Sequence, residues 1–458
     1  MKKKLLSTAI AAGMGMGLMS TAAQAVYVNA QGTGQVLLYP YYSAENGNDT
    51  YVQVVNTSNV GKVVKVRFLE SKNSQEVLDF NLYLSANDVW AGAVTATANG
   101  GAKIVTSDTS CTDGTIPADG QPFVNFQYDG DGDSSIERTA EGHVEIIGMA
   151  DIIPGSDLDQ AIDHGTAGVP ADCSYTNGKD FSQGGADAAG NVSSFGSTGD
   201  GAGLYGFSQL VNVEQGVAAK MDATALANFS TNNLWTDAGS VQPDLTDANT
   251  SAVIFDGTGV TTVPFADFLP PAGEGDPVSA VLMTQNIQNS YVVEPDINAG
   301  TDWIVTFPTK GLYVNGTNAP EAPFTTAWDS ADSNACEPVS LSYWDREEQQ
   351  VQSSVEFSPP PPTGPGASLC YEANVVTFNN ADVIGSANTQ NVDVAYTAGW
   401  MDIAFTAQSF TTDPASTNQT FNGLPAIGYS VVEYANGTIG GVVRNYSGAS
   451  KHKETAPY

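Results

Sequence analysis

The sequence predicts a mainly β protein: an antiparallel β-sandwich with long disulfide-tied loop insertions and one or two short helices. Apolar and polar side chains alternate along several short segments, and turn-forming residues such as Asn46-Gly47 separate those segments. In addition, four cysteines lie in loop-like stretches that are rich in Gly, Asp, Ser and Pro. These three observations together are typical of a sandwich whose long loops are fastened covalently.

The first 25 residues have the pattern of a secretory signal peptide. Lys2, Lys3 and Lys4 precede an apolar stretch that ends at Ala23-Gln24-Ala25, a small-x-small cleavage site. We therefore expect an exported chain that begins at Val26. No later apolar run approaches the roughly 18 residues of a transmembrane helix.

Residues 26–152 contain the clearest strand patterns. In 62–70, Val64, Val66 and Phe68 share one face, whereas Lys65 and Arg67 lie on the other. Residues 76–84 repeat this alternation. The pattern indicates antiparallel strands with one face toward the core and one toward water.

The segment 36–42 is apolar on both faces and contains Pro40. Proline cannot donate a ladder hydrogen bond, so this strand is expected at a sheet edge or at a bulge. Two interpretations stay open. Insertions of the same chain cover the strand, or it docks on a second copy by strand addition.

The rest of the chain divides into two regions. Residues 153–202 read as a Gly/Asp/Ser-rich insertion, and 203–458 as a second β-rich region that packs on the first as one composite unit. The best helix candidate is 213–229, and 157–163 can add a short turn. Pro359–Pro362 predict a stiff polyproline segment.

The four cysteines predict two disulfides, because an even number in an exported chain is normally paired. Of the three possible connectivities, sequence proximity favours Cys111–Cys173 and Cys336–Cys370. A zinc site is disfavoured because the chain has no CxxC pair and only three histidines.

The chain is strongly acidic, with 16 basic and 50 acidic residues and a net charge of −34. Loss of the three leader lysines leaves 13 basic residues and a charge of −37. Such a surface repels nucleic acid and makes divalent cations natural counter-ions.

The stretch 129–137, "DGDGDSSIE", is a candidate calcium loop. Asp129, Asp131 and Asp133 stand at alternate positions and Glu137 follows, which supplies the oxygen ligands that calcium prefers. The positions that would carry the Gly and Glu of a helix–loop–helix site are Ser134 and Ala140. The alternatives are therefore a calcium site in a β-loop and a solvated acidic turn.

Catalytic motifs find little support. "GFSQL" and "GYSVV" lack the closing glycine of a nucleophile elbow, and the Gly-rich stretches lack phosphate-binding spacing. Three histidines offer few general bases. The sequence therefore favours a protein that is not an enzyme.

Five stretches, "LLYPYYSAENGNDTYVQVVNTS", "KVVKVRFLESKNSQEVLDFNLYLSANDVWAG", "RTAEGHVEIIGMA", "TDWIVTFPTKGLYV" and "GLPAIGYSVVEYANG", resemble a family of uncharacterised secreted proteins of Proteobacteria. The family usually has Asn-Glu-Tyr where this chain has Asn289-Ser290-Tyr291. The resemblance implies export and a surface setting, and it brings no catalytic residues.

The expected function is accordingly a non-enzymatic structural or adhesive protein of the cell surface or extracellular matrix, with the periplasm as another possible location. Its expected partners are a second copy, through 36–42, or a surface polysaccharide. The alternative function is a polysaccharide-binding module with exposed aromatic side chains and a calcium-stabilised loop.

Overall fold

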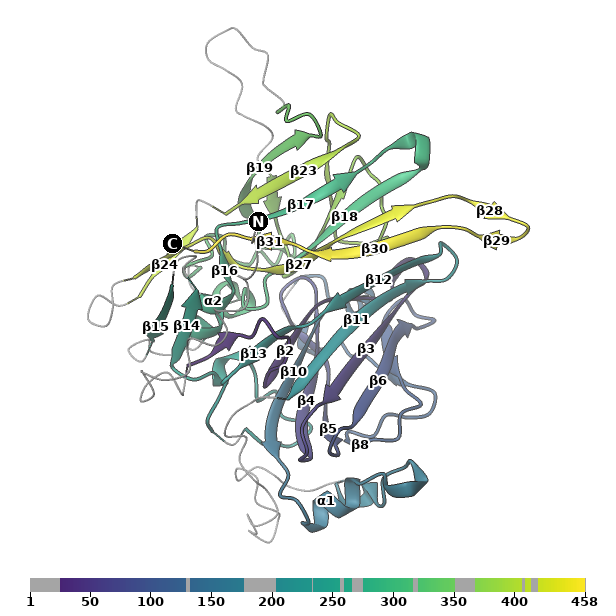
Figure 1. Cartoon of the computed structure of the whole chain (residues 1–458), viewed down its shortest axis with the longest axis vertical. Helices are drawn as coiled ribbons and strands as arrows, with labels where there is room; N and C mark the ends of the chain where they lie inside the picture. Colours follow the sequence, from purple (N-terminus) through teal and green to yellow (C-terminus); the bar gives the residue numbers. More distant parts are fainter. Residues whose placement is uncertain are drawn as a thin grey trace, which may run out of the picture.

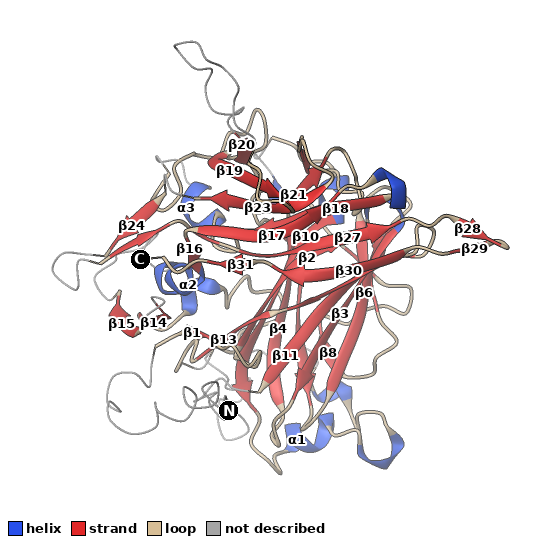
Figure 2. Cartoon of the chain, turned by 45° about the horizontal axis from the view of Figure 1, so that its top comes forward, coloured by secondary structure: helices blue, strands red, loops and turns tan. Residues whose placement is uncertain are grey.

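The computed structural model describes residues 25–128, 132–176, 203–232, 234–255, 259–265, 275–315, 320–350, 367–405, 408–412 and 419–457. Strands make up 47% and helical segments 11% of the structure. Figures 1 and 2 show the strands in two β-sandwiches that stack against each other, which confirms the predicted fold class. Within the described ranges, no helix is long and apolar enough to cross a membrane.

The N-terminal sandwich consists of two antiparallel sheets. The seven-stranded sheet has the order β1 (Tyr27–Val28), β13 (Thr224–Ala227), β2 (Val36–Ser43), β10 (Glu141–Asp151), β4 (Lys62–Glu70), β5 (Glu76–Leu84) and β8 (Cys111–Asp113). The six-stranded sheet has the order β12 (Val217–Asp222), β11 (Leu204–Asn212), β3 (Asn48–Asn56), β6 (Val89–Ala96), β7 (Ala102–Val105) and β9 (Gln121–Pro122).

The core of this sandwich follows from the alternation in its strands. Val52 and Val54 of β3 face Val64, Val66 and Phe68 of β4 across the space between the sheets, in one apolar cluster. Each such buried side chain contributes roughly 1.5–3 kcal/mol relative to an exposed one. The opposite face of β3 stays open to solvent, as the alternating pattern predicts.

Strand β2 lies inside the seven-stranded sheet, and all eight of its residues are buried. Leu37 and Tyr39 belong to the core between the sheets, whereas Val36 and Leu38 belong to a second cluster on the other face. The apolar segment is therefore part of the protein's own core, covered by its own chain. Strand addition of a second copy through residues 36–42 is wrong, because the strand is already paired and covered.

Pro40 occupies an irregular place in β2. The pairing with β13 covers only Val36–Leu38, and the pairing with β10 shifts its register between Gly142 and Val144. The missing N–H of Pro40 therefore costs no ladder bond to β13. The bulge that the proline predicts is confirmed, whereas an edge position is wrong.

The C-terminal sandwich has two five-stranded sheets. One has the order β20 (Ala367–Leu369), β19 (Glu337–Asp345), β23 (Ala398–Ala404), β17 (Asn286–Val292) and β31 (Lys453–Glu454). The other has the order β22 (Thr389–Val392), β21 (Ala373–Phe378), β18 (Ala299–Thr306), β27 (Ile427–Tyr434) and β30 (Tyr446–Lys451), in which β21 and β22 are parallel. Trp303, Tyr291 and Phe378 pack between the sheets.

The remaining elements are short. Two-stranded sheets join β14 (Ser251–Phe255) to β15 (Val260–Pro264), β16 (Met283–Thr284) to β26 (Leu424–Pro425), β24 (Ser409–Thr411) to β25 (Thr420–Asn422), and β28 (Thr438–Ile439) to β29 (Val442–Val443). The α-helices are α1 (Asp157–Ile162), α2 (Asp276–Leu282) and α3 (Gly311–Val314). The 3-10 turns are Glu45–Gly47, Phe126–Tyr128, Ile136–Ala140, Gly165–Ala167, Cys173–Tyr175, Leu245–Asp247 and Pro295–Ile297.

A shared apolar cluster joins the two sandwiches. Tyr41 and Leu210 of the N-terminal sandwich pack with Ile304 and Val431 of the C-terminal sandwich. Strand β12 also lies beside β30 (Figure 1). The boundary expected at residue 203 differs from this architecture, because 204–227 supply β11, β12 and β13 to the N-terminal sandwich.

The helix expected at 213–229 is wrong. Val217, Ala219 and Met221 are buried and alternate with exposed Ala218 and Lys220, so this segment is strand β12, followed by β13. The short helical turn expected at 157–163 is confirmed as α1, where the Ser156 side chain accepts a hydrogen bond from the Asp159 amide. The polyproline segment lies outside the described residues.

Both disulfides have the expected pairing, Cys111–Cys173 and Cys336–Cys370. The first fastens the insertion after α1 to the edge strand β8 of the N-terminal sandwich. The second joins the residue directly before β19 to the residue directly after β20. Of the insertion, residues 153–176 are described and 177–202 lie outside the described residues.

Candidate functional site

The predicted calcium loop is only partly described. Asp129 and Asp131 lie outside the described residues, whereas Asp133 and Glu137 lie within them. The Asp133 carboxylate forms an ion pair with Lys72 Nζ at 2.7 Å and accepts a hydrogen bond from the Ser135 amide at 3.0 Å. Although partial burial raises its pKa, these bonds lower the pKa of Asp133 to about 2.

Glu137 lies in the first turn of the 3-10 segment Ile136–Ala140 and packs against Gly100, where a Cβ atom would come within 2.8 Å of the Glu137 Cγ. Among the residues that the structure describes, no group of three His, Cys, Asp or Glu side chains is arranged to hold a metal. The calcium site therefore stays a prediction that involves two further carboxylates.

The outer face of the seven-stranded sheet was expected to meet water, and this expectation is wrong. Lys65 is fully buried and Arg67 is 8% exposed. Lys65 Nζ forms an ion pair with Asp79 at 2.9 Å and donates to the carbonyls of Asp237 and Ser240, each at 2.9 Å. These bonds fasten the segment around residues 237–240 over the sheet.

Arg67 lies at the centre of a buried carboxylate cluster. Its Nε bonds Glu76 at 2.8 Å and its Nη1 bonds Glu145 at 2.6 Å. Burial raises the pKa of Glu145 to about 7, against the lowering effect of the Arg67 charge. Asp244 adds a third negative charge nearby.

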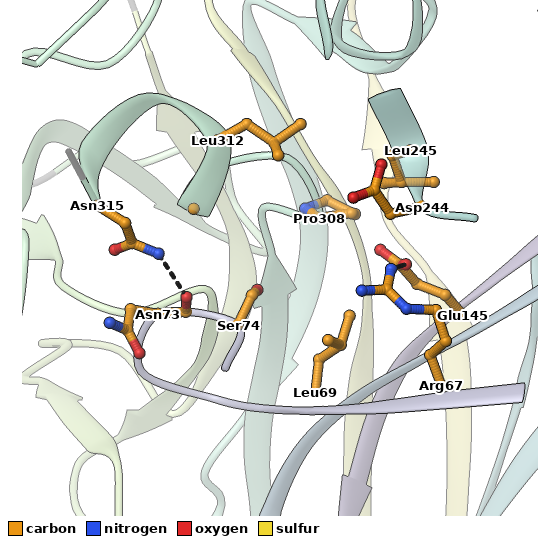
Figure 3. A pocket seen from close by; sticks show the side chains of 11 residues that line it. Arg67, Leu69, Asn73, Ser74, Glu145, Asp244, Leu245, Pro308, Leu312 and Asn315 are labelled. Carbon is orange, nitrogen blue, oxygen red and sulfur yellow. Dashed lines mark hydrogen bonds and ion pairs between the residues drawn. The ribbon is translucent and has the colours of Figure 1, made fainter. Parts of the chain in front are cut away.

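A cavity of about 150 Å³ adjoins this cluster, and Figure 3 shows its lining. Arg67 and Glu145 lie on one side and Leu245, Pro308 and Leu312 on others, with Leu312 supplied by α3. This volume suits a few water molecules, whereas pockets for organic ligands typically measure about 300–1,000 Å³. The cavity is therefore polar packing space between elements.

A second buried ion pair joins Arg138 to Glu70. Arg138 Nε bonds Glu70 Oε2 at 2.8 Å and Nη2 bonds Oε1 at 2.9 Å, and both side chains are fully buried. The guanidinium also stacks over the Tyr128 ring, 4.2 Å from its centroid. This bidentate geometry fixes the 3-10 turn at 136–140 against the end of β4.

Glu141 connects the two sandwiches. Its carboxylate, on β10, accepts hydrogen bonds from Tyr41 Oη at 2.9 Å and from Ser386 Oγ at 2.7 Å, and the Ala387 amide donates to it as well. Burial raises the pKa of Glu141 to about 7, although these donors lower it. Each of the buried charges described so far thus bonds groups from other elements, an arrangement that serves architecture.

A larger hollow lies on the surface, where the two sandwiches meet. We call it the seam groove; its volume is about 790 Å³ and its lining comprises residues 28–33, 205–206, 220, 222–225, 429, 449 and 451. The β1–β2 loop, β11, β12 and the β12–β13 link contribute from the N-terminal sandwich, and β27 and β30 from the C-terminal one. Pockets occur preferentially at such domain interfaces.

Aromatic side chains continue from the groove over the open face of the six-stranded sheet. Tyr205 is 41% and Tyr51 40% exposed, and the Tyr51 and Phe207 rings lie 6.4 Å apart between centroids. Lys220 Nζ sits 4.4 Å from the Phe207 centroid and pairs with Asp222 Oδ1 at 2.6 Å.

A separate aromatic pair lies on the outer face of the C-terminal sandwich. Trp344 of β19 and Trp400 of β23 are cross-strand partners whose rings stack with centroids 4.2 Å apart, and Trp400 is 40% exposed. Two residues along β23, Asp402 Oδ2 accepts hydrogen bonds from the side-chain amides of Asn286 and Gln288, both at 2.6 Å.

The sequence offered a weak signal for these surfaces. The alternation in β11 and β12 would have placed Tyr205 and Lys220 on one outer face, but the helix assignment concealed it. The groove itself combines residues more than 200 positions apart, which only tertiary structure brings together.

No protein-family model, curated protein or solved structure matches this chain.

Proposed function

We propose that this chain is a non-enzymatic exported protein with a structural or adhesive role at the cell surface or in the extracellular space. The observation that carries the proposal is a rigid two-sandwich body with aromatic side chains on open sheet faces, Tyr51 and Tyr205 on one and Trp400 on another. Aromatic side chains that gather on an open sheet face are suited to recognition, because they offer large apolar surfaces to a partner. The signal-peptide pattern and the two disulfides are compatible with export.

The interior supports the same proposal. Lys65, Arg67 and Arg138 hold loops and turns against the sheets, and Glu141 ties one sandwich to the other. These buried ion pairs and hydrogen bonds stabilise one arrangement of the strands and loops. A protein that bears load or presents a surface needs that property.

Cell fractionation together with electron microscopy of labelled native cells tests the proposal. We expect the protein on the outer surface or in the surrounding matrix, and a deletion strain with weaker attachment to surfaces or neighbouring cells. A cytoplasmic location, or unchanged attachment beside normal matrix in the deletion strain, would contradict it.

Polysaccharide binding is the second candidate. The stacked Trp344–Trp400 pair and the amide-held Asp402 favour it, because flat aromatic rings beside fixed hydrogen-bonding groups suit sugar rings and their hydroxyls. A glycan screen on the purified protein separates this candidate from a purely structural role. Binding to no glycan would exclude it and leave the structural role standing.

A further inference from the structure

We infer that the seam groove binds a segment of a neutral polysaccharide. The inference rests on the polysaccharide-binding function proposed above and assigns its ligand class and site. The groove is large enough for several sugar units, whereas the interior cavity beside Arg67 is not.

The groove presents both kinds of contact that a sugar chain requires. Tyr205 stands exposed on its rim, where the ring can stack on the apolar face of a sugar. Lys220 and Asp222 lie side by side in the lining and supply a donor and an acceptor for hydroxyl groups. Gln31, exposed on the β1–β2 loop, adds an amide from the opposite element.

Hydrogen bonds fix the backbone on both sides of the groove. Asn29 Nδ2 donates to the Thr33 carbonyl at 2.7 Å, and Asn29 Oδ1 accepts from the Gln31 amide at 3.0 Å, which shapes the loop. On the other side, Tyr429 Oη donates to the Asp222 carbonyl at 2.9 Å across the junction of the sandwiches. A preformed site loses less conformational entropy when a flexible chain binds.

The charges of the groove lining and of the whole chain favour an uncharged polysaccharide over a charged one. Acidic residues outnumber basic ones 50 to 16 in the chain, yet the groove lining contains Lys220 and Lys451 and only one acid, Asp222. Both lysines are neutralised by ion pairs, Lys220 with Asp222 and Lys451 with Glu454. A polycation finds no attraction at this lining, and the net charge of −37 that the exported chain carries repels a polyanion.

Affinity electrophoresis tests the inference, with the exported chain run in gels that contain β-glucan, galactomannan, dextran, xylan or polygalacturonate. We expect retardation by at least one of the four neutral polymers, at low and high NaCl alike. Tyr205→Ala and Lys220→Met should each weaken that binding about tenfold, equivalent to about 1.4 kcal/mol. Met keeps an alkyl chain of similar length and removes the ammonium group, and with it the ion pair to Asp222 and the contact with the Phe207 ring.

Matched variants outside the groove serve as controls. Tyr446→Ala removes a tyrosine that is 66% exposed on β30, and Lys453→Met removes an exposed lysine of β31; neither residue lines the groove. Both should bind as the parent does. Unchanged thermal midpoints must accompany all four variants.

The remaining outcomes distinguish the inference from the function on which it rests. If Trp400→Ala abolishes binding while Tyr205→Ala does not, the groove assignment is wrong and polysaccharide binding stands. Salt-sensitive binding to polygalacturonate alone would overturn the neutral class. Retardation by none of the polymers would overturn both proposals.

Discussion

At the scale of single residues, the buried ion pair between Arg138 and Glu70 should be the one whose disruption lowers the free energy of unfolding most. Glu70→Ala leaves a fully buried guanidinium without its carboxylate, so we expect a loss of about 3–5 kcal/mol in the free energy of unfolding. The double variant Glu70→Ala/Arg138→Met should lose clearly less than the two single variants combined, because no unpaired charge remains. Urea denaturation measures all three.

Lys451→Met is the matched control for this experiment. Its ion pair with Glu454 is 3.4 Å long and about 40% exposed, so its loss should change stability by no more than about 0.5 kcal/mol. A Glu70→Ala variant as stable as this control would show that the buried pair contributes nothing.

Calcium is the second prediction at this scale. Millimolar calcium should raise the thermal midpoint, and Asp131→Ala with Asp133→Ala should remove most of the gain. Ligand at a hundredfold excess over Kd stabilises by about 2.7 kcal/mol. Because Lys72 already pairs with Asp133, Lys72→Met should strengthen the calcium effect. An equal effect of magnesium at matched ionic strength would identify a merely solvated acidic turn.

At the scale of elements, strand β2 makes the sharpest prediction. Deletion of residues 26–43 removes an interior strand whose two faces contribute to three apolar clusters. The shortened chain should therefore fail to fold, with loss of the near-ultraviolet circular dichroism signal and rapid proteolysis. The chain from Val26 is the control, and a folded truncation would contradict the interior role of β2.

Local patterns predicted those strands whose two faces differ. The alternation of Val64, Val66 and Phe68 with Lys65 and Arg67 identified β4 correctly, because short-range periodicity determines which residues share a face. The same alternation wrongly predicted that the face with Lys65 and Arg67 is exposed to solvent, whereas it is buried. A segment 172 to 175 residues later covers it, and no local pattern contains that information.

The failure at β12 and β13 has a different cause. Ala218, Ala219, Met221 and Ala223 have high helix propensity, so the segment satisfied a helical pattern as well as an alternating one. Pairing with β11 and β2 overrides the local preference. The candidate site shares this limit, because the seam groove exists only after those pairings form.

At the scale of the whole molecule, stability should peak in mildly acidic solution. Burial raises the pKa of Glu141, Glu145 and Asp276 to about 7 in the folded state. A raised pKa means that this contribution is complete below the unfolded value, near 4.5 for Glu and 3.8 for Asp, and is lost as pH rises through about 7.

The buried histidines determine how stability falls toward acidic pH. Burial lowers the pKa of His143 and His452 to about 3, so their contribution is complete above about 6.5 and is lost as pH falls toward 3. Between about pH 4.5 and 6.5 the three carboxyl groups lose more stability than the two histidines gain, whereas below about 4.5 the loss from the histidines dominates. We therefore expect the thermal midpoint to be highest near about pH 4.5 and to fall on both sides. Glu141→Gln should flatten the alkaline side specifically. A midpoint that rises steadily from pH 5 to pH 8 would contradict this account.

The position of β2 also determines the order in which the molecule can be completed during biogenesis. Its neighbours are β10, which starts at Glu141, and β13, which starts at Thr224. A chain that emerges from its N-terminus therefore exposes this strand, which is fully buried in the folded protein, long before either neighbour exists. Naked strands of this kind recruit one another into aggregates. Until residue 227 has emerged, we expect a chaperone that holds unfolded chains to shield residues 36–43, so that one of the earliest strands to appear is among the last to be enclosed.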